Sequence, residues 1–249
     1  MTLYVGTSGW AYREWKPDFY PQDLPQARFL DHYGSVLGAC EVNATFYKLQ
    51  SEQTFARWAE ATPETFRYAA KAHRRITHVR HMAPDENGRS FIATFLKSLA
   101  PLGHRLGTVL LQYPPYRSRD DDALSKVLGA LPDTMSYAFE FRHDSWIAPE
   151  VSEILERAGA TTCLASTTGE VPEALPSGPI GYVRLRAERY TEEQRAGWLE
   201  LLTKEARDRD VFAFTKHEGI PAGDPFGGIG LAQWLRRETT PRPYPQSDG

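Results

Sequence analysis

The stretch Cys40-Glu41-Val42-Asn43 alternates apolar and polar side chains, so that Glu41 and Asn43 share one face of a predicted strand. Five further apolar runs end in polar side chains with the same spacing: Lys71 and His73, Gln112, Glu140 and Arg142, Arg184 and Arg186, and Lys216. Because strand side chains alternate with period two, all these groups can face one common centre. Polar side chains gathered at strand ends are typical of a binding or catalytic site.

Eight apolar runs with the composition of strands are spaced along the chain, at residues 3–6, 40–44, 66–71, 108–113, 137–142, 161–165, 181–185 and 211–215. Amphipathic stretches separate most of them, and one begins with the capping-box pattern of Thr191 and Gln194. Residues 167–179, after the sixth run, have no convincing helical pattern. Strands that alternate with helices pair in parallel, since parallel neighbours need a crossover connection.

We therefore predict an α/β fold consisting of a single (β/α)8 TIM-like barrel, with a weak or missing helix after strand six. An open doubly wound sheet is less favoured, because residues 6–10 match neither of the glycine-rich phosphate loops. We expect residues 1–238 to form the barrel domain. Residues 239–249 contain three prolines and are predicted to be a disordered tail.

Composition limits the partners and the cellular location. The chain has 249 residues, of which 24% are charged, and its net charge of −3 argues against a broad surface for duplex DNA. Cys40 and Cys163 lie in apolar runs, so we expect two reduced, buried thiols. No apolar run approaches the roughly 20 residues that span a bilayer, and no signal-peptide pattern opens the chain. These features predict a soluble, cytoplasmic protein without a membrane partner.

The predicted mouth of the barrel carries an excess of positive charge. Its five cations outnumber its two acids by three, and the residues counted are Lys71, Arg142, Arg184, Arg186 and Lys216 against Glu41 and Glu140. This sign is opposite to that of the whole chain and predicts an anionic ligand. Phosphate or carboxylate is favoured, because a guanidinium offers a planar fork to both. The alternative is a structural network in which Glu140 pairs with Arg142 and Glu41 with Lys71.

Aromatic side chains and histidines follow the same strands. We expect Trp10, Tyr47, His143 and Trp146 to contribute to substrate binding, as a rim above the basic floor. Such a rim suits a stackable ring, such as a nucleotide or a single-stranded base, and sugars stack on aromatic rings too. The histidines are surrounded by Lys and Arg, which oppose cation binding. No cofactor is therefore predicted, and a divalent metal is the lesser alternative.

Several motifs occur together: GTSGWAYREW at residues 6–15, EVNATFY at 41–47, QYPP at 112–115 and EFRH at 140–143. Taken together, residues 3–237 resemble the domain-of-unknown-function-72 family, also called YecE-like. The resemblance implies a TIM-barrel-like fold but no reaction. Members look similar in fold to endonuclease IV and sugar-isomerase barrels, which suggests nucleic-acid or phosphosugar ligands by analogy alone. The zinc-binding cluster of endonuclease IV has no equivalent in this chain.

The chain departs from the family pattern in two places. Many members have a His-Gly pair after the arginine of strand seven, where this chain has Leu185-Arg186-Ala187. Many also end strand eight with an aromatic residue and Asn, where this chain has Lys216 and His217. Both departures make the predicted pocket more basic.

The leading hypothesis is a hydrolase, lyase or isomerase acting on a phosphate-bearing substrate, such as a nucleotide, a phosphosugar or a nucleic-acid end. In this hypothesis the anion is bound by Arg142, Arg184, Lys71 and Lys216, and it is oriented by Asn43 and Gln112. Glu41 or Glu140 serves as general base, with Lys71 as an alternative base or Schiff-base nucleophile.

Two other functions compete with this hypothesis. One is a non-catalytic protein that binds nucleotides or short nucleic acids with the same basic floor and aromatic rim. The other is a glycoside hydrolase that uses Glu41 and Glu140 as its carboxyl pair. It ranks lowest, because the surrounding positive charge depresses the pKa of both groups and hinders the general acid.

Overall fold

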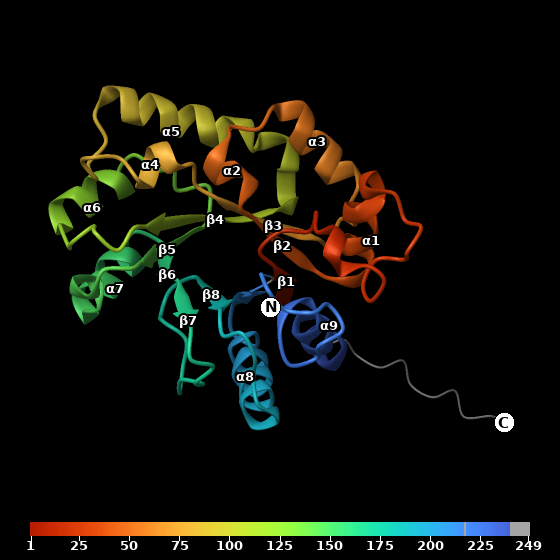
Figure 1. The fold of residues 1–249 in the computed structure, drawn as a ribbon. Helices are drawn as coiled ribbons and strands as arrows, with labels where there is room; N and C mark the ends of the chain where they lie inside the picture. The colour runs from red at the N-terminus through yellow and green to blue at the C-terminus, as the bar shows by residue number, and fades with distance from the viewer. Residues whose placement is uncertain (217, 240–249) are drawn as a thin grey trace.

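The strands form one continuous parallel sheet that curls into a nearly closed barrel, with the helices outside it (Figure 1). The computed structural model describes residues 1–216 and 218–239, and these contain nine strands. The strands are β1 (Leu3–Thr7), β2 (Ala39–Val42), β3 (Arg67–Lys71), β4 (Leu106–Tyr113), β5 (Tyr137–Phe141), β6 (Ala160–Thr162), β7 (Leu164–Ser166), β8 (Ile180–Leu185) and β9 (Asp210–Thr215). Hydrogen-bonded neighbours follow the order β6-β5-β4-β3-β2-β1-β9-β8-β7, and every pair is parallel.

The sixth predicted strand is split at Cys163. Its first half, β6, pairs with β5, and the Cys163 N–H donates to the Phe139 carbonyl at 2.8 Å. Its second half, β7, pairs with β8 instead. The two edges of the sheet therefore meet within one strand, and the Thr161 hydroxyl bridges them by donating to the Ile180 carbonyl at 3.0 Å. The predicted TIM-like barrel is confirmed, with nine strands in place of eight because one strand is divided.

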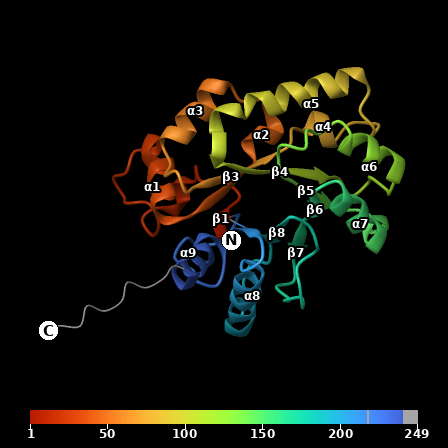
Figure 2. The same cartoon turned by 180° about the vertical axis from the view of Figure 1, so that it is seen from behind.

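The helices pack against the outside of the barrel. The longer ones are α1 (Phe29–Val36), α3 (Glu52–Glu60), α5 (Glu86–Ser98), α6 (Asp121–Leu128), α7 (Pro149–Arg157), α8 (Glu192–Glu205) and α9 (Gly228–Thr239). Single turns are α2 (Ala44–Tyr47), α4 (Arg74–Thr77) and the 3-10 segments η1 (Arg13–Trp15), η2 (Gln26–Arg28), η3 (Ala100–Arg105) and η4 (Asp144–Trp146). The helices α3 and α5 lie across the barrel from α8 and α9 in both views (Figures 1 and 2).

Local signals at the helix ends match the structure. Thr191 and Gln194 form the predicted capping box at the start of α8. Residues 167–179 contain no helix, as predicted. Thr239 is the last residue of α9, and the rest of the predicted disordered tail lies outside the described residues.

The interior of the barrel is apolar at one end and polar at the other. Its apolar layer consists of Tyr4, Ala39, Ala69, Leu110, Ala138, Cys163, Ile180, Tyr182, Phe212 and Phe214. Gly6 is needed where β1 meets β2, because a Cβ there would lie 1.8 Å from the Ala39 carbonyl oxygen. The polar side chains point inward from the carboxyl ends of the strands. This apolar layer closes the bottom of the barrel and leaves the polar end as the place for a site.

Candidate functional site

Arg184 lies at the centre of the polar end and is only 3% exposed. Its Nη2 donates to Glu41 Oε1 at 2.8 Å, and its Nη1 donates to Glu140 Oε2 at 2.5 Å. Tyr182, two residues earlier on the same face of β8, donates its hydroxyl to Glu41 Oε2 at 2.8 Å. Both oxygens of Glu41 are therefore bound, by side chains that a single strand contributes.

The electrostatics of this cluster follow from its burial. Burial alone raises the pKa of Glu41, but the charges of Arg184 and Lys71 and the hydroxyl of Tyr182 outweigh it. The pKa of this carboxyl therefore lies below its usual range. Burial also opposes the charge of Arg184, yet the neighbouring Glu41 and Glu140 hold its pKa well above the usual value. Glu41 and Arg184 therefore both stay ionised at neutral pH.

Two further cations lie between this cluster and solvent. Arg142 donates from Nε to Glu140 Oε1 at 2.7 Å, and its side chain is 44% exposed. Lys71 donates from Nζ to Gln112 Oε1 at 2.8 Å and lies 4.5 Å from the centre of the Phe46 ring. Burial, together with the charge of Arg184, lowers the pKa of Lys71 to about 8. A substantial fraction of Lys71 is therefore uncharged just above neutral pH.

A cavity of about 430 Å³, here called the site cavity, opens over the cluster. Its lining residues are Tyr12, Asn43, Phe46, Tyr47, Lys71, His78, Gln112, Arg142, Arg184, Arg186 and Glu218. Arg186 is held at its edge, with Nη2 at 3.5 Å from Glu218 Oε2 and Nη1 at 3.5 Å from Ser8 Oγ. The lining thus combines four cations with one acid, and it has aromatic side chains on one wall.

Half of the twelve predicted site residues line this cavity: Asn43, Tyr47, Lys71, Gln112, Arg142 and Arg184. Glu41 and Glu140 lie directly beneath it, bound to Arg184, and are not among the lining residues. The network alternative therefore also holds in part. Glu140 pairs with Arg142 as that alternative proposed, whereas Glu41 is hydrogen-bonded to Arg184 and not to Lys71.

The other four predicted residues lie elsewhere. The ring of Trp10 packs edge-on against Trp58, with centroids 5.0 Å apart. His143 caps η4 by accepting from the Ser145 N–H. Lys216 Nζ lies 3.5 Å from Glu188 Oε1, outside the site cavity.

Trp146 is buried and stacks on Phe141, and it lines a separate cavity. Lys216 is directed away from the site cavity, so four cations remain there. Glu218 joins Glu41 and Glu140 as a third acid. The local charge is therefore +1. The predicted excess of three is reduced accordingly.

Five lining residues were not selected from the sequence as site residues: Tyr12, Phe46, His78, Arg186 and Glu218. Arg186 was counted at the predicted mouth by its alternation with Arg184, whereas the other four lie beyond the strand ends, where no alternation indicates direction. Tyr182 could have been found, because it shares the parity of Arg184 on β8. Phe46 could also have been predicted, because it is adjacent to the predicted site residue Tyr47 in the same turn, α2.

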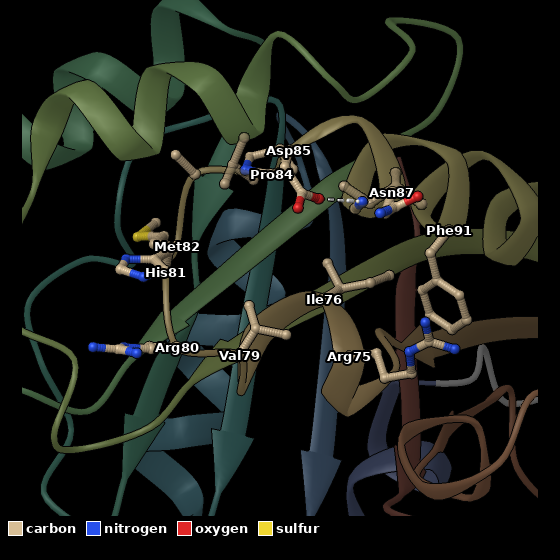
Figure 3. Close-up of a pocket in the computed structure, with 14 residues that line it drawn as sticks. Arg75, Ile76, Val79, Arg80, His81, Met82, Pro84, Asp85, Asn87 and Phe91 are labelled. Carbon is tan, nitrogen blue, oxygen red and sulfur yellow. Dashed lines mark hydrogen bonds between the residues drawn. The ribbon is translucent and has the colours of Figure 1, made fainter.

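A further cavity of about 450 Å³ lies between α4, the segment after it and the start of α5 (Figure 3). Apolar side chains such as Ile76 and Met82 line it, and the Arg75 guanidinium lies over the Phe91 ring at 4.3 Å. None of the predicted site residues lines it, so it does not compete as the main site.

Within residues 1–216 and 218–239, no group of three His, Cys, Asp or Glu side chains is arranged to hold a metal ion. His217 lies outside the described residues. Across the same described part of the chain, the helices are too short or too polar to traverse a bilayer.

The chain matches known proteins in both sequence and structure. A family model described as "Protein of unknown function DUF72" matches residues 4–247. The UPF0759 protein YunF of Bacillus subtilis is 29% identical over 160 residues, which cover 61% of this chain and 54% of YunF. This match therefore spans about half the length of that relative.

Solved structures share the fold. A DUF72 family protein of Thermotoga maritima superposes with a TM-score of 0.75 at 22% identity, covering 96% of this chain and 99% of that one. One from Enterococcus faecalis gives 0.73 at 16% identity, covering 97% of both chains. A D-psicose 3-epimerase gives 0.52 at 11% identity, covering 94% and 90%.

Proposed function

Because the chain belongs to the DUF72 family, whose function is unknown, we propose its function from the site cavity: an enzyme that acts on a small phosphate-bearing substrate. The observation that carries the proposal is Lys71, an amine with a pKa of about 8 inside a cavity that three arginines also line. The reaction class would be hydrolysis, elimination or isomerisation. These reactions need a positioned base and charge stabilisation, and no redox group.

Arg142 and Arg186 are the best anion-binding groups. Each is held by one carboxylate at the edge of the cavity, so both have donors that face a ligand. Arg184 is more fully committed, because two buried glutamates already bind its terminal nitrogens. A volume of about 430 Å³ falls in the range of small-molecule sites. A phosphosugar or a mononucleotide is of suitable size.

Lys71 is a better candidate than Glu41 for moving a proton or forming a Schiff base. Both oxygens of Glu41 are bound, and its lowered pKa makes it a weak base. Lys71 faces the cavity, and about a tenth of it is uncharged at neutral pH if its pKa is about 8. A glycosidase function is not favoured, because Glu41 and Glu140 both bind the Arg184 guanidinium and neither lines the site cavity.

Isothermal titration calorimetry tests the proposal with methyl phosphate, ribose 5-phosphate and adenosine 5′-monophosphate, each against its uncharged counterpart. Arg142→Gln should weaken binding of the phosphate compounds by about tenfold or more, as expected for one charge-assisted hydrogen bond. Lys71→Gln should weaken binding and abolish any turnover. Lys204→Gln, on the surface of α8, is the matched control and should bind as the wild type does.

Three results would separate the competing functions. If no phosphate compound binds more tightly than its uncharged counterpart, the proposal is wrong. Binding without turnover of any compound favours the non-catalytic alternative. A steep loss of oligonucleotide affinity with salt would then indicate a nucleic-acid ligand, because phosphate contacts release counterions.

A further inference from the structure

A second cavity opens where the strand divides, and we call it the seam cavity. It has a volume of about 490 Å³. Beyond the Phe139–Thr162 pair, β5 has no ladder to β7 among the described residues, because β7 pairs with β8. The wall of the barrel is therefore parted at its carboxyl end, where Phe141 from β5 and Ala165 from β7 both line the cavity.

The seam cavity is mainly apolar, and one of its walls is rigid. Trp146 is buried and stacks on Phe141, with ring centroids 4.1 Å apart and planes 10° from parallel. The Trp146 indole N–H donates to the Arg117 carbonyl at 2.7 Å, which fixes the ring. Leu164 and Pro176 add further apolar surface.

Exposed apolar side chains concentrate at the same end of the barrel. Among the described residues, the large apolar side chains that are most exposed are Met1, Tyr47, Tyr116 and Ile147. The last three follow β2, β4 and β5, on the loops of the carboxyl end. Tyr47 lines the site cavity, and Ile147, which is 84% exposed, lines the seam cavity.

One ion pair separates the two cavities. Glu140 lines the seam cavity, and its carboxylate holds Arg142 and Arg184, which both line the site cavity. An anion bound to Arg142 would therefore lie one ion pair away from the apolar seam. The two cavities are neighbours along β5, one of them basic and the other apolar.

We propose that the seam cavity binds the apolar part of the same ligand whose phosphate lies in the site cavity. The ligand is then an amphipathic phosphate monoester, with a hydrocarbon or aryl group attached to the phosphate. This inference rests on the proposed function and narrows its substrate class. It identifies Trp146 and Phe141 as the wall that selects for the apolar group.

Calorimetry with a homologous series tests this inference: methyl, propyl, hexyl and phenyl phosphate. In the wild type, affinity should rise by roughly fourfold for each methylene that enters the seam. Ala165→Trp fills the cavity and should remove this gain while leaving the affinity for methyl phosphate unchanged. Ala196→Trp, exposed on α8 and outside both cavities, should keep the gain. Ser152→Phe, on α7, is the second blocking variant if Ala165→Trp does not fold.

The outcomes distinguish this inference from the proposed function. If methyl phosphate binds but hexyl and phenyl phosphate bind no more tightly, the seam inference is wrong and the proposed function stands. A gain that persists in both blocking variants also overturns it. If no phosphate ester binds, the proposed function fails, and the inference that rests on it fails as well.

Discussion

Replacing the central arginine tests whether Arg184, Glu41 and Glu140 form a desolvated ion-pair cluster. Arg184→Met keeps much of the side-chain volume and removes the charge from between Glu41 and Glu140. Glu140 retains Arg142 as a partner, but Glu41 retains only neutral hydroxyls, those of Tyr182 and Ser8. The variant therefore leaves one fully buried carboxylate without a cation in contact with it.

The expected loss follows from the burial of both partners. Removing one partner of a buried ion pair costs about 3–5 kcal/mol, because the remaining charge is uncompensated. For a chain of this length, that corresponds to a fall in melting temperature of roughly 6–20 °C. Arg207→Met, an exposed arginine beyond α8, is the matched control and should change stability by less than about 0.5 kcal/mol.

The difference in stability between the wild type and Arg184→Met should depend on pH in a defined direction. In the wild type the pKa of Glu41 is lowered, so its stabilising contribution is present above the unfolded value and is lost as the pH falls. In Arg184→Met, burial raises the pKa of Glu41 instead, and the penalty fades as the carboxyl becomes protonated. The stability gap is therefore largest near neutral pH. It shrinks toward pH 4.5 as Glu41 of the variant becomes protonated, and it shrinks further below pH 4.5 as the wild type loses the contribution of its own Glu41.

Urea unfolding of the wild type and both variants, at several pH values, measures this gap. Adding Glu41→Gln to Arg184→Met should recover part of the lost stability, because the buried charge is then gone. A loss below about 1 kcal/mol would contradict the interpretation of the cluster as a desolvated ion pair. So would a gap that does not change with pH.

Three other substitutions test separate parts of the structure by urea unfolding. The wild type should gain stability relative to Lys71→Met between pH 8 and 10.5, because the folded lysine loses its proton near 8 while the unfolded lysine keeps it; a constant gap would argue against the lowered pKa. Tyr182→Phe should cost about 1.5–3 kcal/mol, since it removes a hydrogen bond to a buried carboxylate, and no loss would mean that this contact is unimportant. Gly6→Ala should cost about 3 kcal/mol or more, because the new Cβ would meet the Ala39 carbonyl. Gly38→Ala is the control and should be tolerated, because the nearest atom to the added Cβ lies 3.8 Å away.

The alternation of side chains along strands accounts for what could be predicted. Within a strand the period is two, so Glu41, Lys71, Gln112, Glu140 and Arg184 had to point into a barrel once a barrel was predicted. All five meet there. The order of elements was sufficient for the fold, because alternating strands and helices leave few parallel architectures.

Residues beyond the last paired position of a strand were not predictable in this way. Lys216 follows the last residue of β9, and its side chain turns to Glu188 in a neighbouring loop. Trp10 lies in a loop and Trp146 ends the 3-10 segment η4, and packing against Trp58 and Phe141 decides their direction. These partners are brought together by the folded chain, and no local pattern encodes them.

The division of the sixth strand was also absent from the local pattern. Residues 161–165 form an uninterrupted run that suits one strand. The change of partner from β5 to β8 at Cys163 is a property of the whole barrel, because closing the sheet requires both edges to meet somewhere. The exchange of ion-pair partners around Arg184 is of the same kind, since it depends on three strands at once.

The divided strand has a consequence for motion. In the described sheet, β5 has no ladder to β7 and β6 has none to β8, so parting the wall along this line breaks no paired strand. We therefore expect the barrel wall to open locally at this point more readily than elsewhere, against restraints that include the Thr161 hydroxyl bound to the Ile180 carbonyl. The amide of Ala165 should exchange with solvent faster than amides in β1 or β9 at the centre of the sheet order. A molecule bound in the seam cavity would slow that exchange, so the exchange rate of the Ala165 amide would indicate whether the cavity is occupied.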